Sequence, residues 1–360
     1  MKHLRHIVVF LLLVCAAFAQ EPLDTVGRVD AAVRQFQSNT LAPAVTVAVA
    51  VNGKLTYSKA FGIADIENEV RATPETLIRT GSIAKPMAAA AALTLVDAGK
   101  LELDLPIQKY CPTFPQKPWV ITTRELLGHL SGIRHYRGDE IASTKHYVSM
   151  SEAFEIFGND PLLFEPGTKY SYTTYGFTVV GCVIEGSSGE KFADYVAQHV
   201  LRPAGMKHTF IDDVYSIVPH RARGYQKVQG RVENAGLMDS SYKLPGGGYV
   251  STAEDLVRFQ LAMMNDRIVK PATLARMWTS QSTTDGKLTH YGMGFGVLDV
   301  DGVHLVGHSG SQQGTSTAMM AVPSRHFAAA VMVNMEGVNA QSLVFSIMKI
   351  YDTPAPSMTR

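Results

Sequence analysis

The chain has 360 residues, with 33 basic and 32 acidic side chains and only three cysteines. This length permits one large hydrophobic core, or a core with an added lobe, and the balanced charge excludes a strongly basic nucleic-acid-binding or membrane-surface protein. The cysteines are too few for a disulfide-rich scaffold. The twelve histidines show no spacing typical of metal ligands, so we expect no metal and no other cofactor.

The first residues predict a secretory signal peptide. Basic residues and histidines at positions 2–6 precede an apolar run from Ile7 to Ala19, which is too short to span a bilayer. The run ends in Ala17-Phe18-Ala19, a small-x-small cleavage site. We therefore expect residues 1–19 to be removed and residues 20–360 to form a periplasmic or secreted protein. An uncleaved membrane anchor is the alternative.

Strand signals lie near both ends of the chain. Val45–Val51 and Lys54–Tyr57 flank Asn52-Gly53, which is a strong hairpin signal. Near the C-terminus we predict strands at 294–298, 317–322 and 327–334, a turn at Pro323-Ser324, and a final helix at 340–351.

The middle of the chain is mostly helical by pattern. Helices are predicted at 88–98, 123–129, 151–157, 178–185, 191–201, and from the capping box Ser251-Thr252-Ala253-Glu254 through Met264. The expected fold is α+β, with an antiparallel sheet from about 40–80 and 290–355 that is flanked by helices. An all-helical lobe from about 86–285 completes one unit, with a cleft between the two parts.

Two cysteines remain after the expected cleavage. Cys182 lies in an apolar helix pattern and fits a small core residue, and Cys111 lies in the helical middle. The sequence leaves open whether the two cysteines pair.

The segment Ser82-Ile83-Ala84-Lys85 carries the clearest chemical signal. It lies where an extended run, Leu77–Thr80, gives way to an Ala-rich helix. A lysine three residues after a serine shares its helix face, and a neutral, desolvated lysine can take the proton of the hydroxyl. The bland alternative is an ordinary N-cap serine.

The four-residue pattern alone is weak, because it recurs three more times. The other pairs are Ser188–Lys191, Ser240–Lys243 and Ser346–Lys349. None of these serines starts a buried helix after a strand, so the pattern at Ser82 stands apart.

Two further segments follow Ser82 in the order that an acyl-transfer site needs. A tyrosine-rich loop after Pro166-Gly167 contains Tyr172 and Thr174 and leads into an apolar helix. The second segment, Gly307-His308-Ser309-Gly310-Ser311, precedes a predicted strand. Its glycines would let a substrate backbone lie against the strand edge.

With these segments in place, the chain resembles the serine β-lactamase-related family, which includes class C β-lactamases, D-alanyl-D-alanine carboxypeptidases and related esterases. It is most similar to the mitochondrial β-lactamase-like subgroup and its bacterial relatives. The segments that carry this resemblance span nearly the whole chain after the signal peptide: 82–85, 126–136, 166–176, 246–252 and 307–310.

The resemblance implies a role for each matched residue. Ser82 would be the acylated nucleophile, Lys85 its proton acceptor, and Tyr172 a proton shuttle to the leaving group. The sequence leaves open whether Lys85 or Tyr172 is the general base. The N–H groups of Ser82 and Ser311 would form the oxyanion hole. The substrate-binding positions would be Thr174, His308, Ser309 and Gly310.

Two positions depart from the lactamase pattern. Thr174 stands where asparagine is usual, and His308 stands where lysine is frequent. A partly charged histidine should hold a substrate carboxylate weakly, so we expect poor β-lactam hydrolysis. Thr174 could instead cap a helix, His308 could be an edge-strand histidine, and Tyr172 could be a packing aromatic.

The sequence therefore predicts a secreted serine hydrolase that acts on peptide-like amides or esters. The alternative is a non-catalytic binding or scaffold protein that keeps the fold. An α/β-hydrolase is rejected, because Gly307–Ser311 lacks the final glycine of the nucleophile elbow and precedes a strand rather than a helix. The segments at His129, Ser131 and His135 are expected to be loop structure rather than chemistry, and the oligomeric state stays open.

Overall fold

The computed structural model describes residues 24–352. The predicted signal peptide, residues 1–19, lies outside the described residues. Within the described residues, no helix is both long enough and apolar enough to cross a bilayer.

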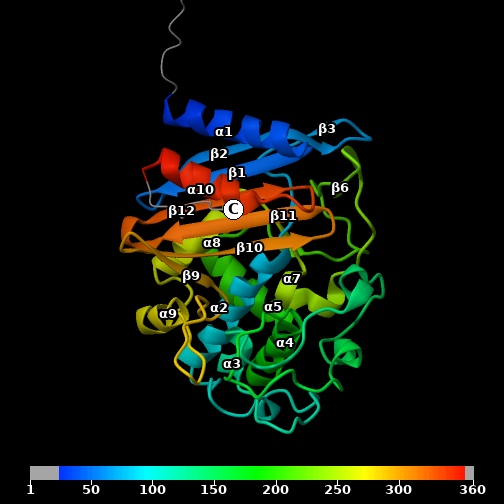
Figure 1. Ribbon diagram of the computed structural model, residues 1–360, viewed down its shortest axis with the longest axis vertical. Coiled ribbons are helices and arrows are strands. Elements are labelled where there is room, and N and C mark those ends of the chain that lie inside the picture. The colour runs from blue at the N-terminus through cyan, green and yellow to red at the C-terminus, as the bar shows by residue number, and fades with distance from the viewer. Residues whose placement is uncertain (1–23, 353–360) are drawn as a thin grey trace, which may run out of the picture.

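A seven-stranded antiparallel sheet forms the upper part of the molecule (Figure 1). The strands follow the order β3-β2-β1-β12-β11-β10-β9, so the two ends of the chain build the sheet together, as predicted. The strand bounds are β1 Ala44–Val51, β2 Lys54–Asp65, β3 Val70–Arg71, β9 Gly296–Val300, β10 Val303–Gln312, β11 Thr315–Val322 and β12 Phe327–Val333.

The predicted hairpin at Asn52-Gly53 is confirmed. Both residues have positive φ angles, 50° and 75°, and they join β1 to β2. Positive φ at both central positions gives the turn whose twist matches that of the flanking strands.

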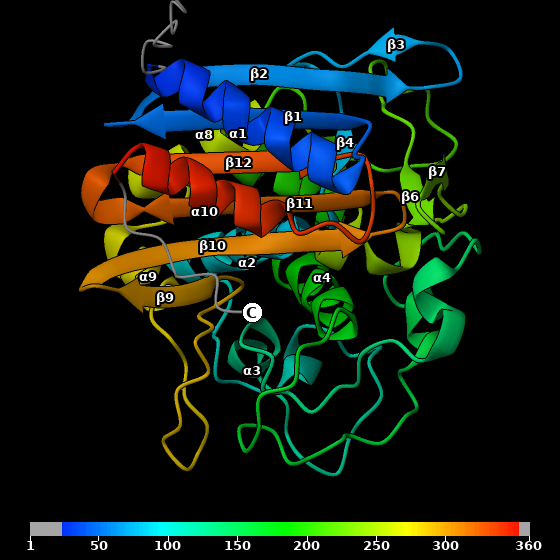
Figure 2. The same cartoon turned by 45° about the horizontal axis from the view of Figure 1, so that its top comes forward.

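Helices cover both faces of the sheet (Figure 2). On one face α1 (Thr25–Thr40) and α10 (Ala340–Ile350) pack beside each other, and on the other face α8 (Ala253–Met264) packs against β1 and β12. Alternate residues of β12 therefore enter two separate cores, with Ala330 in one and Val331 in the other. This double burial explains why β12 is apolar along its whole length.

The middle of the chain folds below the sheet and is mainly helical. Its helices are α2 Ala84–Asp97, α3 Thr123–Leu127, α4 Tyr175–Ser188, α5 Phe192–Val196, α6 Arg202–Ala204, α7 Leu244–Gly247, α8 and α9 Pro271–Met277. Two small sheets also occur there; only β4 lies in a run predicted as extended, whereas β5 to β8 lie where helices were expected. They contain β4 Ile78–Arg79, β8 Tyr249–Ser251 and β5 Phe210–Ile211, and the hairpin β6 Tyr225–Val228 with β7 Arg231–Asn234.

Several predicted boundaries are wrong in detail. The capping residue of α8 is Thr252 rather than Ser251, because the Thr252 side chain accepts from the Asp255 N–H. The helix expected at 151–157 is a short 3₁₀ segment, Glu152–Ile156. Helix α1 was not predicted at all.

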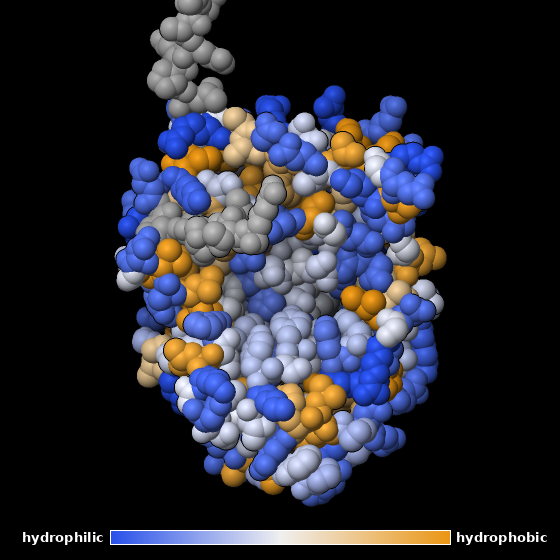
Figure 3. Space-filling view, viewed as in Figure 1, coloured by the Kyte–Doolittle hydropathy of each residue, from blue (hydrophilic) through white to orange (hydrophobic). Residues whose placement is uncertain are grey.

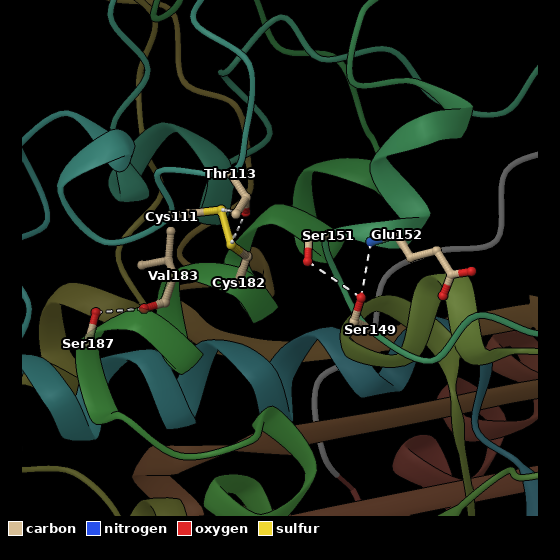
Figure 4. Close-up of a disulfide and its surroundings, with 8 residues drawn as sticks. All are labelled: Cys111, Thr113, Ser149, Ser151, Glu152, Cys182, Val183 and Ser187. Atoms are coloured by element: carbon tan, nitrogen blue, oxygen red, sulfur yellow. Dashed lines mark hydrogen bonds between the residues drawn. A yellow bond between two sulfur atoms is a disulfide. The ribbon is translucent and has the colours of Figure 1, made fainter.

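A disulfide joins Cys111 to Cys182 and answers the question that the sequence left open. Figure 4 shows the bond between the loop that holds Cys111 and helix α4, with Thr113 beside it. The Thr113 hydroxyl lies 3.5 Å from the Cys182 sulfur. The bond therefore ties a long loop to the helix that begins at Tyr175, next to Thr174.

The disulfide should contribute measurably to stability. It links residues 71 positions apart, and loop-closure entropy for that separation corresponds to about 4 kcal/mol as an upper value. We expect the double variant Cys111→Ser/Cys182→Ser to lose up to this amount in urea unfolding. Wild type kept in reductant is the control and should match the variant. Equal stability of the oxidised wild type and the variant would contradict the prediction.

Candidate active site

Ser82 lies where β4 leads into α2. The Thr80 N–H donates to the Tyr249 carbonyl at 2.8 Å, which fixes the end of the strand. The chain then turns through the 3₁₀ segment Gly81–Ile83, and the caps of this turn and of α2 are Thr80 and Ile83. Ser82 is therefore not the N-cap serine of the alternative interpretation, and its hydroxyl is left for Lys85.

Lys85 is fully buried and lies against Ser82. Its Nζ is 2.9 Å from the Ser82 hydroxyl oxygen. The same nitrogen lies 3.1 Å from Thr174 Oγ1 and 3.0 Å from the Gly246 carbonyl oxygen. The start of α2, the start of α4 and the short helix α7 therefore meet at one amine.

Burial lowers the pKa of Lys85 well below its usual range, and the positive charge of Lys243 lowers it further. Within residues 24–352, no acidic side chain pairs with its Nζ to favour the charged form. A neutral amine has two N–H groups and one lone pair. With Gly246 O and Thr174 Oγ1 accepting the N–H groups, the lone pair is left for the Ser82 O–H.

The Tyr172 ring lies beside the same amine. Nζ of Lys85 is 4.7 Å from the centroid of the ring. Burial raises the pKa of the Tyr172 phenol well above its usual range, although a hydrogen bond with Ser82 acts in the opposite direction. The phenol therefore keeps its proton at neutral pH, which suits a proton donor.

Two histidines hold the segment that carries Tyr172. His129 Nδ1 accepts from the Thr173 N–H at 3.1 Å, and His135 Nδ1 accepts from the Thr174 N–H at 3.2 Å. The His129 ring also packs on Tyr172, with 4.2 Å between centroids. Burial lowers the pKa of His135 to about 4 and that of His129 well below its usual range, so both rings are neutral acceptors. Both rings therefore support the backbone directly behind Tyr172, and His135 also lines the cavity of Ser82.

Thr174 does not cap α4, although it stands at the N-cap position. Its hydroxyl contacts Lys85, and its side chain also lines the cavity beside Ser82. Gly246 has to be a glycine next to it, because an added Cβ would lie 2.5 Å from the Thr174 methyl carbon. Thr174 therefore accepts a hydrogen bond from the Lys85 amine and helps to hold it in place.

The segment Gly307–Ser311 precedes strand β11, as predicted, but it is itself part of strand β10, which was not predicted. Pairing with β9 ends at Gly307, opposite Gly296. From His308 onward the β10 edge on that side has no partner strand among residues 24–352, so its main chain is open towards the cavity.

The main chain of β10 approaches Ser82 closely. A Cβ added to Gly310 would lie 2.9 Å from the Ser82 nitrogen, and one added to Gly81 would lie 2.8 Å from the Ser311 nitrogen. Thr317 fixes this contact, because its hydroxyl donates to the Thr80 carbonyl at 2.7 Å. The two amides expected to form the oxyanion hole thus lie on facing segments.

His308 differs from the expectation of a partly charged side chain. Burial lowers its pKa to about 3, with a further effect from Lys85, so the ring is neutral at neutral pH. Nδ1 lies 2.5 Å from the Ser309 carbonyl and must donate to it, which leaves Nε2 to accept from the Tyr291 hydroxyl at 2.9 Å. His308 therefore supplies no cation for a substrate carboxylate.

Ser82 opens into a cavity of about 280 Å³ between β10 and the helical region. Figure 3 shows this face of the molecule hollowed below the sheet. The lining includes the expected residues Ser82, Tyr172, Thr174, His308, Ser309 and Ser311. One site therefore gathers side chains from three distant segments.

The other three Ser-x-x-Lys pairs form no such contact. The hydroxyls of these serines bond elsewhere: Ser188 to the Ile184 carbonyl, Ser240 to Asp212 and Ser346 to the Ser342 carbonyl. Of the four pairs, all within the described residues, the structure gives a serine–lysine hydrogen bond only to Ser82 and Lys85.

A family model described as β-lactamase matches residues 29–344. The chain belongs to the β-lactamase family. It is 29% identical to the human mitochondrial serine β-lactamase-like protein LACTB, over 86% of this chain and 77% of that protein. The resemblance inferred from the motifs is thus confirmed, and this β-lactamase-family chain is a serine hydrolase by membership.

Solved structures show the same fold. An octameric penicillin-binding protein homologue from Pyrococcus abyssi superposes with a TM-score of 0.80 at 24% identity, covering 91% of this chain and 78% of that chain. A D-amino acid amidase from Ochrobactrum anthropi SV3 superposes with a TM-score of 0.78 at 23% identity, covering 91% and 97%. The β-lactamase-family fold of this chain is therefore established by both sequence and structure.

Sequence reasoning missed several residues of the site, and Tyr291 and Gly246 are two that contact its predicted members. Tyr291 donates to His308, and the Gly246 carbonyl accepts from Lys85. Tyr291 carried no signal, because a lone tyrosine in a loop is ordinary. Gly246 was expected only to permit a tight backbone path beside the cleft.

Replacing Lys85 by methionine should slow acylation of Ser82 by about 10²- to 10⁴-fold, the usual effect of losing a general base. The lowered pKa leaves the wild-type amine neutral below the usual lysine range, so the wild-type rate should fall only as the pH drops through the Lys85 titration. The measurement is the rate of fluorophosphonate labelling against pH.

Lys349→Met, from the same sequence pattern in α10, is the matched control and should label like wild type. A wild-type rate in Lys85→Met would rule out Lys85 as the base.

Proposed function

We propose that this β-lactamase-family chain is an exported hydrolase that cleaves ester or amide bonds of peptide-like substrates through an acyl-enzyme on Ser82. The observation that carries the proposal is the buried amine of Lys85, 2.9 Å from the Ser82 hydroxyl and free of any acidic partner among residues 24–352. A serine so placed is an activated nucleophile.

In the proposed first step, Ser82 Oγ attacks the substrate carbonyl carbon and its proton passes to Lys85 Nζ. The N–H groups of Ser82 and Ser311 stabilise the oxygen that becomes negative. The bond to the leaving group then breaks, and the leaving group takes a proton from the Tyr172 phenol, which Lys85 reprotonates. Water next attacks the acyl ester with Lys85 or Tyr172 as base, and Ser82 is regenerated.

We propose that β-lactams are poor substrates. The Thr174 hydroxyl is engaged by Lys85 and offers no side-chain amide to a substrate. His308 is neutral and hydrogen-bonded on both ring nitrogens, so it adds no charge to hold the carboxylate of a penicillin. Acylation should occur, but Thr174 and His308 contribute little to the binding of a β-lactam.

Export is part of the proposal, on two grounds. The N-terminal residues have the pattern of a signal peptide. The Cys111–Cys182 disulfide is of the kind that persists in oxidising compartments, such as the periplasm or the exterior of the cell.

A fluorophosphonate or a labelled penicillin should attach to wild type and fail to attach to Ser82→Ala. Wild type should also hydrolyse 4-nitrophenyl acetate, and Ser82→Ala should not. Ser346→Ala, which alters a serine of the same sequence pattern, is the control and should behave as wild type.

Equal labelling of wild type and Ser82→Ala would remove the mechanism. A wild type that neither labels nor turns over the ester would favour the binding or scaffold alternative.

A further inference from the structure

Two buried donors line the Ser82 cavity without a suitable acceptor. They are the amine of Lys243 and the side-chain amide of Gln312, which are 1% and 5% exposed. Neither takes part in the proposed chemistry at Ser82. Buried polar groups are normally hydrogen-bonded, so two unsatisfied donors in one cavity require an explanation.

Lys243 ends the 3₁₀ segment Ser241–Lys243, directly before α7. Its Nζ lies 3.2 Å from the Met238 sulfur, and this is the only hydrogen-bond contact of that nitrogen among residues 24–352. A thioether is a weak acceptor, and an uncompensated ammonium is costly to bury.

The groups around Lys243 compensate its charge only in part: its Nζ lies 5.6 Å and 5.2 Å from the ring centroids of Tyr136 and Tyr242. Asp212 is the acidic residue whose charge raises the pKa of Lys243. Its Oδ2, however, already accepts from Arg79 Nε at 2.7 Å and from the Ser240 hydroxyl at 3.3 Å. Burial, followed by the charge of Arg79, lowers the pKa of Lys243 to about 7, while Asp212 raises it. The other titratable groups facing it are Lys85 of α2, His135 and Tyr136 of the loop after α3, and Tyr242.

Gln312 is the last residue of β10, at the open edge of the strand. Its side-chain nitrogen is buried and has no hydrogen-bond partner within the part of the chain that the structure describes. The side chain lies against α7, because a Cβ added to Gly247 would be 3.1 Å from the Gln312 Oε1. Gln312 and Lys243 thus flank α7, and both residues are among those that line the cavity of Ser82.

Lys243 and Gln312 carry the hydrogen-bond donors and the positive charge for a carboxylate that His308 does not provide. The cavity contains a neutral histidine at one position of β10 and, at another part of its wall, an amine and an amide with free donor capacity. A carboxylate accepts several hydrogen bonds and would satisfy both donors while pairing with the charge of Lys243.

We propose that Lys243 and Gln312 bind a carboxylate of the substrate, so that the hydrolase prefers substrates with an anionic group close to the scissile bond. This inference rests on the proposed function of Ser82. The carboxylate can belong to an acidic side chain on the acyl part or to a free terminal carboxylate on the leaving group. Both sources present the same chemistry to the two donors.

Two matched substrate pairs separate these sources. For the acyl part, the 4-nitrophenyl monoester of glutaric acid is compared with that of glutaramic acid. For the leaving group, hippuryl thioglycolate is compared with its carboxamide. The measured quantity is the kcat/KM ratio of acid to amide after subtraction of spontaneous hydrolysis.

Wild type should prefer the acid of one pair by about 10- to 100-fold, the usual effect of a hydrogen bond to a charged group. The pair that shows the preference identifies the source. Lys243→Met should bring that ratio close to one, and Gln312→Leu should lower it to a smaller extent. Lys100→Met, an exposed lysine beyond the far end of α2, should leave it unchanged.

The wild-type ratio should also fall as the pH rises through about 7, because Lys243 then loses its charge. The ratio isolates this effect, since the titration of Lys85 acts on both members of a pair alike. The pH dependence is measured on wild type, so it tests whether Lys243 binds the carboxylate even if Lys243→Met fails to fold.

Hydrolysis of all four substrates with ratios near one, or a preference that survives in folded Lys243→Met, would overturn this inference and leave the proposed function intact. Hydrolysis of none of them would overturn the proposed function and this inference with it.

Discussion

The site depends on keeping one lysine amine buried without a carboxylate. Among the described residues, Lys85 Nζ forms hydrogen bonds only with the Ser82 hydroxyl, the Thr174 hydroxyl and the Gly246 carbonyl. An acidic neighbour would stabilise the ammonium and abolish its use as a base. Three elements meet at this amine: the start of α2, the start of α4, and α7. The disulfide ties α4, through Cys182, to the loop that holds Cys111. Burying the Lys85 amine costs free energy, and the packing of the rest of the fold has to offset that cost.

Local signals predicted much of this fold. The Asn52-Gly53 turn, the apolar run of β12 and the amphipathic final helix each act within a few residues, so the sequence displays them directly. Helix α1 was overlooked, although Val26, Val29, Val33 and Phe36 recur at helical spacing. Strand β10 was not predicted, for a different reason. Glycines weaken a strand signal, and Gly310 is tolerated because the 3₁₀ segment Gly81–Ile83 packs against it.

Features that depend on contacts between distant segments could not be predicted from the sequence. The pairing of Cys111 with Cys182, the neutral state of His308 and its bond from Tyr291 depend on segments that meet only in the folded chain. Lys243 shows the limit clearly. The Ser240–Lys243 pair was set aside as a repeat of the pattern without chemistry. Ser240 indeed bonds to Asp212 and not to Lys243, but Lys243 is among the residues that line the Ser82 cavity.

The titration of Lys85, followed by NMR in protein labelled with ¹⁵N at lysine Nζ, tests the central claim most directly. The Lys85 resonance, assigned by its loss in Lys85→Met, should change to the neutral amine at a pH well below the usual lysine range of about 10.4. A Lys85 ammonium that titrates together with the exposed lysines would contradict the account, because Ser82 would then have no base beside it.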